Sequence, residues 1–225
     1  MKPHYADDRT TIYHGDCREV LSRLPRLLQA DFVWLVMDPP YGIDYQSGSR
    51  RDTLAASIQG DKDTSLRDEI LARWGDGPAL VFGSWKIARP AGTHTRLIWD
   101  TKGALGMGDL SVPWKPSDQE IYVLGHGFAG PRTSNVLRYA PVQSMARNGR
   151  LHPHEKPVSL MRDLIAKCPG GLILDPFMGS GSTLVAARQL GRRAVGIEID
   201  AGYCATAVDR LGRETSIFDG LDEAA

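Results

Sequence analysis

The sequence predicts an α/β fold with a mainly parallel sheet and helices on both of its faces. Two observations predict it. Apolar runs of strand length alternate with helical patterns along the chain. Several of these runs are apolar throughout, which is typical of strands that helices cover on both sides. With 225 residues, we expect a single domain, residues 1–225, that is large enough to bury its own core.

Six strands are expected, and two stretches between them look irregular. The strands are the short apolar runs at residues 32–37, 79–82, 95–99, 120–124, 171–174 and 194–197. Residues 44–67 are polar, and residues 125–151 are rich in Gly, Pro, Arg and Asn. Long loops in a compact domain are usually binding loops or disordered segments, so both stretches are candidates for ligand contact.

Helical patterns are clearest in the last third of the chain. One helix begins near Pro157, because proline suits a first helical turn. Its buried face is formed by Val158, Met161, Leu164 and Ile165. A second helix spans residues 183–190 and is closed by Gly191. A third begins at Asp200, a good N-cap, and ends near Gly212.

Charge and composition narrow the class of protein. Lys and Arg number 27, as do Asp and Glu, and no apolar run approaches the roughly 18 residues of a membrane span. Three widely spaced cysteines without a Cys-x-x-Cys pair predict free thiols in a reducing cytoplasm and no metal site. Neutrality argues against nucleic acid, but basic residues cluster locally, either as a binding surface or as a merely solvated loop. They are Arg132, Arg138, Arg147, Arg150, Lys156, Arg162 and Lys167.

Residues 38–42, Asp-Pro-Pro-Tyr-Gly, directly follow the first apolar run, at the strand end where α/β sheets bind ligands. An exocyclic amino group on a base is a poor nucleophile, because its lone pair is delocalised into the ring. Hydrogen bonds from its two hydrogens to the Asp38 carboxylate and the Pro39 carbonyl would make the nitrogen pyramidal. Pro39 and Pro40 would fix the backbone, and Tyr41 would stack on the base. The plainer interpretation is a turn capped by Asp38 that ends the strand.

A glycine-rich turn, Asp-Pro-Phe-Met-Gly-Ser-Gly-Ser-Thr at residues 175–183, joins a strand to a helix. Its glycines allow close approach of a ligand, and the helix offers its N-terminal amides. Glu198 ends the next strand, where it could hold two ribose hydroxyls or, alternatively, cap the helix at Asp200. A dinucleotide-binding dehydrogenase shows a similar pattern. However, Ser182 and Thr183 stand where its third glycine would be, and a dehydrogenase leaves the Asp-Pro-Pro-Tyr motif unexplained.

Together these motifs resemble the family of adenine-N6 and cytosine-N4 DNA methyltransferases. The catalytic motif precedes the cofactor motif, as in the group called beta. Three further segments match: residues 13–17 (Tyr-His-Gly-Asp-Cys), residues 99–108 (Trp-Asp followed by Gly-Met-Gly) and residues 152–157 (His-Pro-His-Glu-Lys-Pro). The lysine expected close behind Trp-Asp stands one position late, as Lys102. The resemblance implies the Rossmann-like fold of S-adenosylmethionine-dependent methyltransferases.

The resemblance implies S-adenosylmethionine as the cofactor, with Asp16 at its adenine. His152 and Lys156 lie near the predicted edge of the cofactor and could hold its methionine carboxylate or, alternatively, be surface residues at the start of a helix. The implied catalytic residues are Asp38, Pro39, Pro40 and Tyr41. The implied cofactor-binding residues are Asp16, Cys17, Asp38, His152, Lys156, Asp175, Pro176, Phe177, Gly179, Ser180, Gly181, Ser182, Thr183, Glu198 and Ile199.

Double-stranded DNA is the implied partner, with the target base flipped out of the duplex. Asp at the first motif position favours adenine N6, whereas Ser would favour cytosine N4. The target-recognition insert is expected within residues 125–151, which is short, or is shared with residues 44–77. Phosphate contacts are expected from Arg50, Arg51, Arg132, Arg138, Arg147 and Arg150.

Several alternatives stay open or are disfavoured by single features. A cytosine-C5 methyltransferase needs a nucleophilic cysteine after a proline, and the chain has no Pro-Cys pair. RNA or protein N-methyltransferases typically open the motif with Asn and place the cofactor loop first. A DNA-binding module with a degenerate fold would show a broken motif, and both motifs are intact. Cytosine N4 as the target, a homodimer and a restriction-enzyme partner stay open.

Overall fold

The structure is a computed structural model that describes residues 1–25, 33–40, 63–103, 108–142 and 155–222, with side chains up to residue 213. The chain divides into two compact units. The first unit comprises Met1–Met37, Gly127–Gly130 and Val158–Ala225, and the second comprises Asp38–His126 and Pro131–Pro157. The prediction of a single domain with a target-recognition insert stays a prediction.

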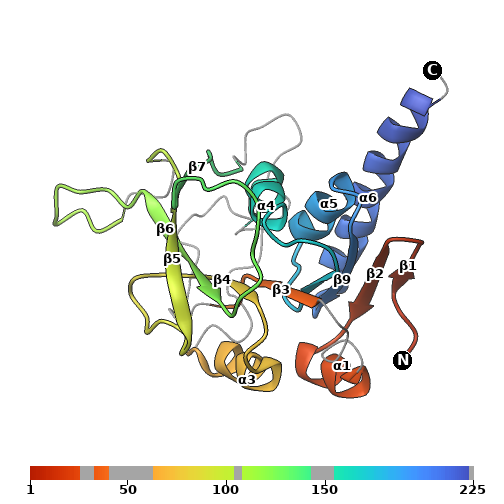
Figure 1. Ribbon diagram of the computed structural model, residues 1–225, viewed down its shortest axis with the longest axis horizontal. Helices are drawn as coiled ribbons and strands as arrows, with labels where there is room; N and C mark the ends of the chain where they lie inside the picture. Colours follow the sequence, from red (N-terminus) through yellow and green to blue (C-terminus); the bar gives the residue numbers. More distant parts are fainter. Residues whose placement is uncertain (26–32, 41–62, 104–107, 143–154, 223–225) are drawn as a thin grey trace. The chain divides into compact units, whose positions relative to one another are not determined.

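The first unit is built on parallel strands (Figure 1). Its strands lie in the order β1 (Tyr5–Ala6), β2 (Thr10–His14), β9 (Arg193–Glu198), β8 (Leu172–Asp175) and β3 (Val33–Met37). β2, β9, β8 and β3 are parallel to one another, and β1 pairs antiparallel with β2. The carboxyl ends of the parallel strands therefore share one edge of the sheet, as the sequence predicted.

Four described helices belong to the first unit: α1 (Cys17–Arg23), α4 (Val158–Ile165), α5 (Ser182–Gln189) and α6 (Ala201–Asp222). α5 packs between α4 and α6. The prediction that the last helix ends near Gly212 is wrong, because α6 continues to Asp222. A single glycine inside a helix costs only about 1 kcal/mol relative to alanine, which does not stop the helix.

The second unit is mainly antiparallel (Figure 1). Its elements are α3 (Ser65–Trp74), β4 (Ala79–Gly83), β5 (Thr93–Asp100), β6 (Asp118–Leu124) and β7 (Val136–Arg138). β6 runs antiparallel to β4 and β5, and β7 runs parallel to β5. Two predictions of irregular structure are corrected here, because α3 begins inside residues 44–67 and β7 lies inside residues 125–151.

The core follows the apolar runs of the sequence. Every residue of β3 and β4 is buried, as predicted for strands covered on both faces. On α4 the buried residues are Leu160, Met161, Leu164 and Ile165. No helix among the described residues is both long enough and apolar enough to cross a membrane.

The three cysteines, Cys17, Cys168 and Cys204, are buried free thiols, as predicted. Burial raises the pKa of each thiol to about 12. None of them is therefore a thiolate at neutral pH, which agrees with a packing role and not a nucleophilic one.

Candidate active site

Asp38 follows Met37, the last residue of β3, and its carboxylate is paired with a lysine from a distant part of the chain. The Lys156 ammonium donates a hydrogen bond to Oδ2 of Asp38 across 118 positions of sequence. The Lys156 side chain is only 6% exposed and that of Asp38 22%. The same ammonium lies 4.9 Å from the centre of the Phe82 ring, near the end of β4. Lys156, predicted to hold the cofactor, thus lies against the predicted catalytic carboxylate and fixes its orientation.

In the first unit, the glycine-rich turn is folded by its own backbone. Asp175 ends β8 as a buried residue, and its Oδ1 accepts a hydrogen bond of 3.0 Å from the Phe177 amide. The Met178 amide donates to the Ile197 carbonyl at 3.1 Å, and the Gly181 amide donates to the Met178 carbonyl at 2.8 Å. Gly179 and Gly181 have φ values of 51° and 84°, in the left-handed region that favours glycine. Gly181 also begins α5 without a side-chain cap.

Glu198 connects the end of β9 to this turn. One carboxylate oxygen accepts from the Gly179 amide at 2.9 Å and the other from the Asp200 amide at 2.8 Å. Burial raises the pKa of Glu198 and outweighs these hydrogen bonds, which lower it. Asp200 itself caps α6, because its Oδ1 accepts from the Gly202 and Tyr203 amides at 2.7 and 3.0 Å. The capping interpretation of Glu198 is thus correct in part, and each of its oxygens keeps a lone pair for a hydroxyl group.

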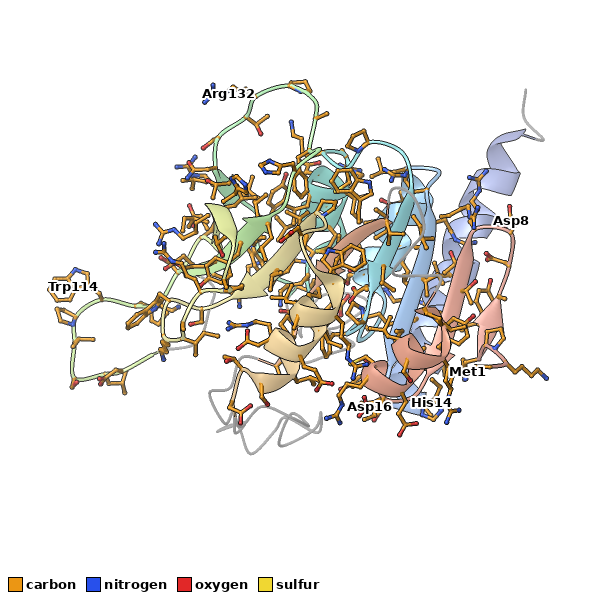
Figure 2. All side chains as sticks on the ribbon, turned by 60° about the horizontal axis from the view of Figure 1, so that its bottom comes forward. Met1, Asp8, His14, Asp16, Trp114 and Arg132 are labelled. Atoms are coloured by element: carbon orange, nitrogen blue, oxygen red, sulfur yellow. The ribbon has the colours of Figure 1, made fainter. Side chains whose placement is uncertain are left out.

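Asp16 lies at the same sheet edge as Glu198. β2 and β9 pair in parallel up to His14 and Glu198, and the Gly15 amide donates to the Glu198 carbonyl at 2.8 Å. Figure 2 shows His14 and Asp16 close together at this edge. Asp16 caps α1, and the hydrogen bond from the Arg18 guanidinium is the main cause of its lowered pKa. Next to Glu198, Ile199 is 51% exposed and offers an apolar contact surface.

One positioning residue was missed by the sequence analysis. Nη1 of Arg210, on α6, donates to the Ser180 carbonyl at 2.9 Å, to the Ser180 hydroxyl at 2.9 Å and to the Ser182 hydroxyl at 3.3 Å. Ser180 and Ser182 are buried, so the hydrogen bonds from Arg210 fix the part of the turn that faces the protein interior. No local sequence signal indicates a contact between residues 30 positions apart.

Of the predicted phosphate contacts, two lie in described segments. Arg132 is exposed (Figure 2), and Nε of Arg138 lies 3.4 Å from Oδ2 of Asp100 while the arginine side chain stays 67% exposed. Six predicted site residues lie outside the described residues: Tyr41, Arg50, Arg51, Arg147, Arg150 and His152.

The fold and the site together define a class: an α/β cofactor-binding transferase with a carboxylate-proline motif suited to an amino group. Within this class, the chain belongs to the DNA methylase family of N6 and N4 methyltransferases, whose family model matches residues 59–209.

Two relatives show how far the likeness extends. The chain is 34% identical to the type II methyltransferase M.HpaI of Haemophilus parainfluenzae, over 92% of this chain and 76% of that protein. It is 27% identical to the type II methyltransferase M.ScaI of Streptomyces caespitosus, over 96% of this chain and 86% of that protein.

Solved structures show the same fold. The M1.HpyAVI complex with S-adenosylmethionine matches with a TM-score of 0.64 at 22% identity, covering 89% of this chain and 99% of that one. The cytosine-N4-specific PvuII DNA methyltransferase matches with a TM-score of 0.64 at 16% identity, covering 97% and 94%. This agrees with the Rossmann-like fold that the sequence predicted.

S-adenosylmethionine is the cofactor of this family, and the first unit fits it chemically. Glu198 offers carboxylate oxygens for ribose hydroxyls, Ile199 offers an exposed apolar side chain for an adenine ring, and the uncapped start of α5 offers amides.

Proposed function

We propose that this protein transfers a methyl group from S-adenosylmethionine to adenine N6 in double-stranded DNA, on a base flipped out of the duplex. Membership of the N6/N4 DNA methylase family supports the reaction class. The observation that carries the site assignment is the Asp38 carboxylate, which directly follows the wholly buried strand β3 and is oriented by the buried Lys156 ammonium.

Asp38 and Pro39 act on the amino group of the target base. The Asp38 carboxylate accepts a hydrogen bond from one amino hydrogen, and the Pro39 carbonyl accepts one from the other. Because both prolines restrict the backbone, this carbonyl needs no reorganisation when the base arrives. The nitrogen lone pair is then drawn out of the ring and becomes nucleophilic. Asp38 thus acts as a hydrogen-bond acceptor first and as a proton acceptor second.

When bound, the cofactor supplies an electrophilic methyl group. Glu198 binds the ribose hydroxyls, Asp16 and Ile199 lie at the adenine, and Lys156 with His152 binds the methionine carboxylate. The turn at residues 175–183 forms the floor of the site, and Arg210 fixes that turn. Positioning supplies most of the rate in such a direct displacement, so the rigidity of the turn matters for catalysis.

Further parts of the proposal concern the DNA. Tyr41 stacks on the flipped base, residues 125–151 carry the target recognition, and the six predicted arginines contact phosphates. Relatives named type II methyltransferases support a restriction-modification role with a restriction enzyme as counterpart. A cytoplasmic location follows from the DNA substrate. The homodimer stays a prediction.

Cytosine N4 is the second candidate target. The cytosine-N4-specific PvuII DNA methyltransferase has the same fold over 97% of this chain, which supports cytosine N4 as an alternative target. We favour adenine because the motif opens with Asp38.

The test incubates unmethylated DNA, RNA and protein in parallel with the enzyme and the cofactor. Mass spectrometry then analyses the nucleosides of the DNA and RNA samples and the peptides of the protein sample. N6-methyladenine in the DNA sample alone is the expected result. N4-methylcytosine in the DNA sample would change only the assignment of the target base, from adenine to cytosine. Methylation of RNA or protein without DNA methylation would refute the proposal.

A further inference from the structure

The turn after β4 exposes an aromatic side chain that is followed by two cations. Trp85 is 70% exposed, and Lys86 and Arg89 are exposed beside it. No acidic residue occurs in residues 84–99. Aromatic side chains interleaved with basic ones are typical of surfaces that bind nucleic acid, because the rings stack on bases while the cations contact phosphates.

Hydrogen bonds and close packing fix the conformation of this turn. The Ile87 amide donates to the Ser84 carbonyl at 3.2 Å, and the Lys86 amide donates to the Ser84 hydroxyl at 3.3 Å. The phenol oxygen of the buried Tyr122, which donates its hydrogen to the Glu120 carboxylate, also lies 3.3 Å from the Ser84 carbonyl. A Cβ on Gly83 would lie 2.5 Å from the Tyr122 ring, so the glycine permits this close packing. The tryptophan is therefore presented on an ordered turn, which lowers the entropy cost of using it in a contact.

The turn follows β4, a strand that contacts the pair formed by Asp38 and Lys156 within the second unit. Phe82, three positions before Trp85, lies under the Lys156 ammonium, and that ammonium pairs with Asp38. The turn therefore belongs to the same unit as the carboxylate that receives the base in the proposed function.

We propose that residues 84–89 contact the DNA beside the target base, an inference that rests on the proposed function. Trp85 stacks against the base pair next to the flipped base and takes up the space that this base leaves. Lys86 and Arg89 contact the flanking phosphates. Such a contact stabilises the flipped state, because it replaces part of the stacking that the duplex loses. None of the arginines that the sequence analysis predicted to contact phosphates lies in this turn.

A second exposed tryptophan provides a matched control. Trp114 is 78% exposed on the loop that joins β5 and β6 (Figure 2). Its exposed neighbours are the apolar Leu110 and Val112 and the cation Lys115, so the two tryptophans have similar surroundings. They differ in the strand that precedes them, because β4 reaches the pair of Asp38 and Lys156 through Phe82. Trp114→Ala removes the same side chain from an equally exposed position.

The experiment compares Trp85→Ala, Trp85→Phe and Trp114→Ala in binding to unmethylated mixed-sequence duplex DNA and in methyl transfer at saturating cofactor. Loss of one aromatic stacking contact is worth about 1–3 kcal/mol. At about 1.4 kcal/mol per tenfold, Trp85→Ala should reduce DNA affinity or transfer by about 5- to 150-fold. Trp85→Phe should restore most of the loss, and Trp114→Ala should match the wild type. Cofactor affinity and thermal midpoint should be unchanged in all three.

The salt dependence separates the aromatic role from the cationic one. Lys86→Gln and Arg89→Gln should each flatten the slope of log affinity against log salt by about 0.9, whereas Trp85→Ala should leave it unchanged. If Trp85→Ala and Trp114→Ala both behave like the wild type while the wild type methylates DNA, this inference is wrong and the proposed function stands. If the wild type methylates no DNA, the proposed function itself fails.

Discussion

Gly196 on β9 lies where a side chain would push against the glycine-rich turn that forms the proposed cofactor site. A Cβ at this position would lie 2.5 Å from Sδ of Met178 and 2.8 Å from Cδ1 of Leu184. Normal carbon contacts are about 3.5–4.0 Å, so Gly196→Ala forces both neighbours to move by about 1 Å. Met178 is 5% exposed and Leu184 fully buried, so neither can swing into solvent. Overpacking of this kind costs about 1–3 kcal/mol.

The displacement should also reach the cofactor. The backbone of Met178 is hydrogen-bonded to Ile197 on one side and to Gly181 on the other, so a shift of Met178 moves the glycine-rich turn. We expect Gly196→Ala to lower the free energy of unfolding by about 1–3 kcal/mol. We also expect it to weaken S-adenosylmethionine binding by about tenfold, which corresponds to about 1.4 kcal/mol.

Urea denaturation measures the first effect and titration calorimetry the second. Gly212→Ala is the matched control, because nothing lies within 4 Å of a Cβ there and the residue is inside α6. It should be neutral or stabilise the protein by up to about 1 kcal/mol. If Gly196→Ala were as stable as Gly212→Ala and bound the cofactor normally, the packing argument would be refuted.

Three further predictions follow from charged groups. Glu198→Gln should weaken cofactor binding by about 10- to 100-fold, because a hydrogen bond to a charged acceptor contributes about 1.5–3 kcal/mol; an unchanged dissociation constant in calorimetry would contradict the ribose contact. Burial opposes ionisation of Asp7, but hydrogen bonds from Tyr5, Arg188 and the backbone lower its pKa from 3.8 to about 2. The stabilisation that ionised Asp7 provides is therefore complete above about pH 4 and is lost as the pH falls toward 2. Urea denaturation of Asp7→Asn should show about 1–2 kcal/mol less stability than the wild type at pH 7 and almost no difference at pH 2. The exposed Asp8→Asn is the control and should show little effect at either pH. Lys156→Met should slow single-turnover methyl transfer by about tenfold at saturating cofactor, because Asp38 loses its orienting cation; wild-type rates would show that the pair plays no part.

Most strands and the two motifs at residues 38–42 and 175–183 could be predicted from the sequence, because an apolar run and a motif are each recognised within a short segment. The five residues of β3 are apolar and all buried. The motif at residues 38–42 that follows them is identified from its own residues, without knowledge of the segments it contacts. α3 was missed because only Arg67 and Ile70 on it are buried, which leaves almost no apolar periodicity. β1 and β7 are too short to stand out, with two and three residues.

Contacts between distant segments could not be predicted. The Asp38 and Lys156 partnership joins residues 118 positions apart, and each was assigned a role on its own from its motif. The contact of Arg210 with the glycine-rich turn depends on how α6 packs against α5, which periodicity does not determine. Trp85 is an ordinary aromatic residue in the sequence, and only its exposure in the structure distinguishes it.

The most direct test of the account is the transfer rate of Asp38 variants with the cofactor bound. Calorimetry first establishes that Asp38→Ala and Asp38→Asn still bind S-adenosylmethionine, and single-turnover transfer to unmethylated DNA is then measured by nucleoside mass spectrometry. We expect N6-methyladenine from the wild type, a loss of at least about 100-fold for Asp38→Ala, and a smaller loss for Asp38→Asn, whose amide oxygen still accepts one hydrogen bond. Transfer by cofactor-loaded Asp38→Ala at the wild-type rate would contradict the role assigned to this carboxylate.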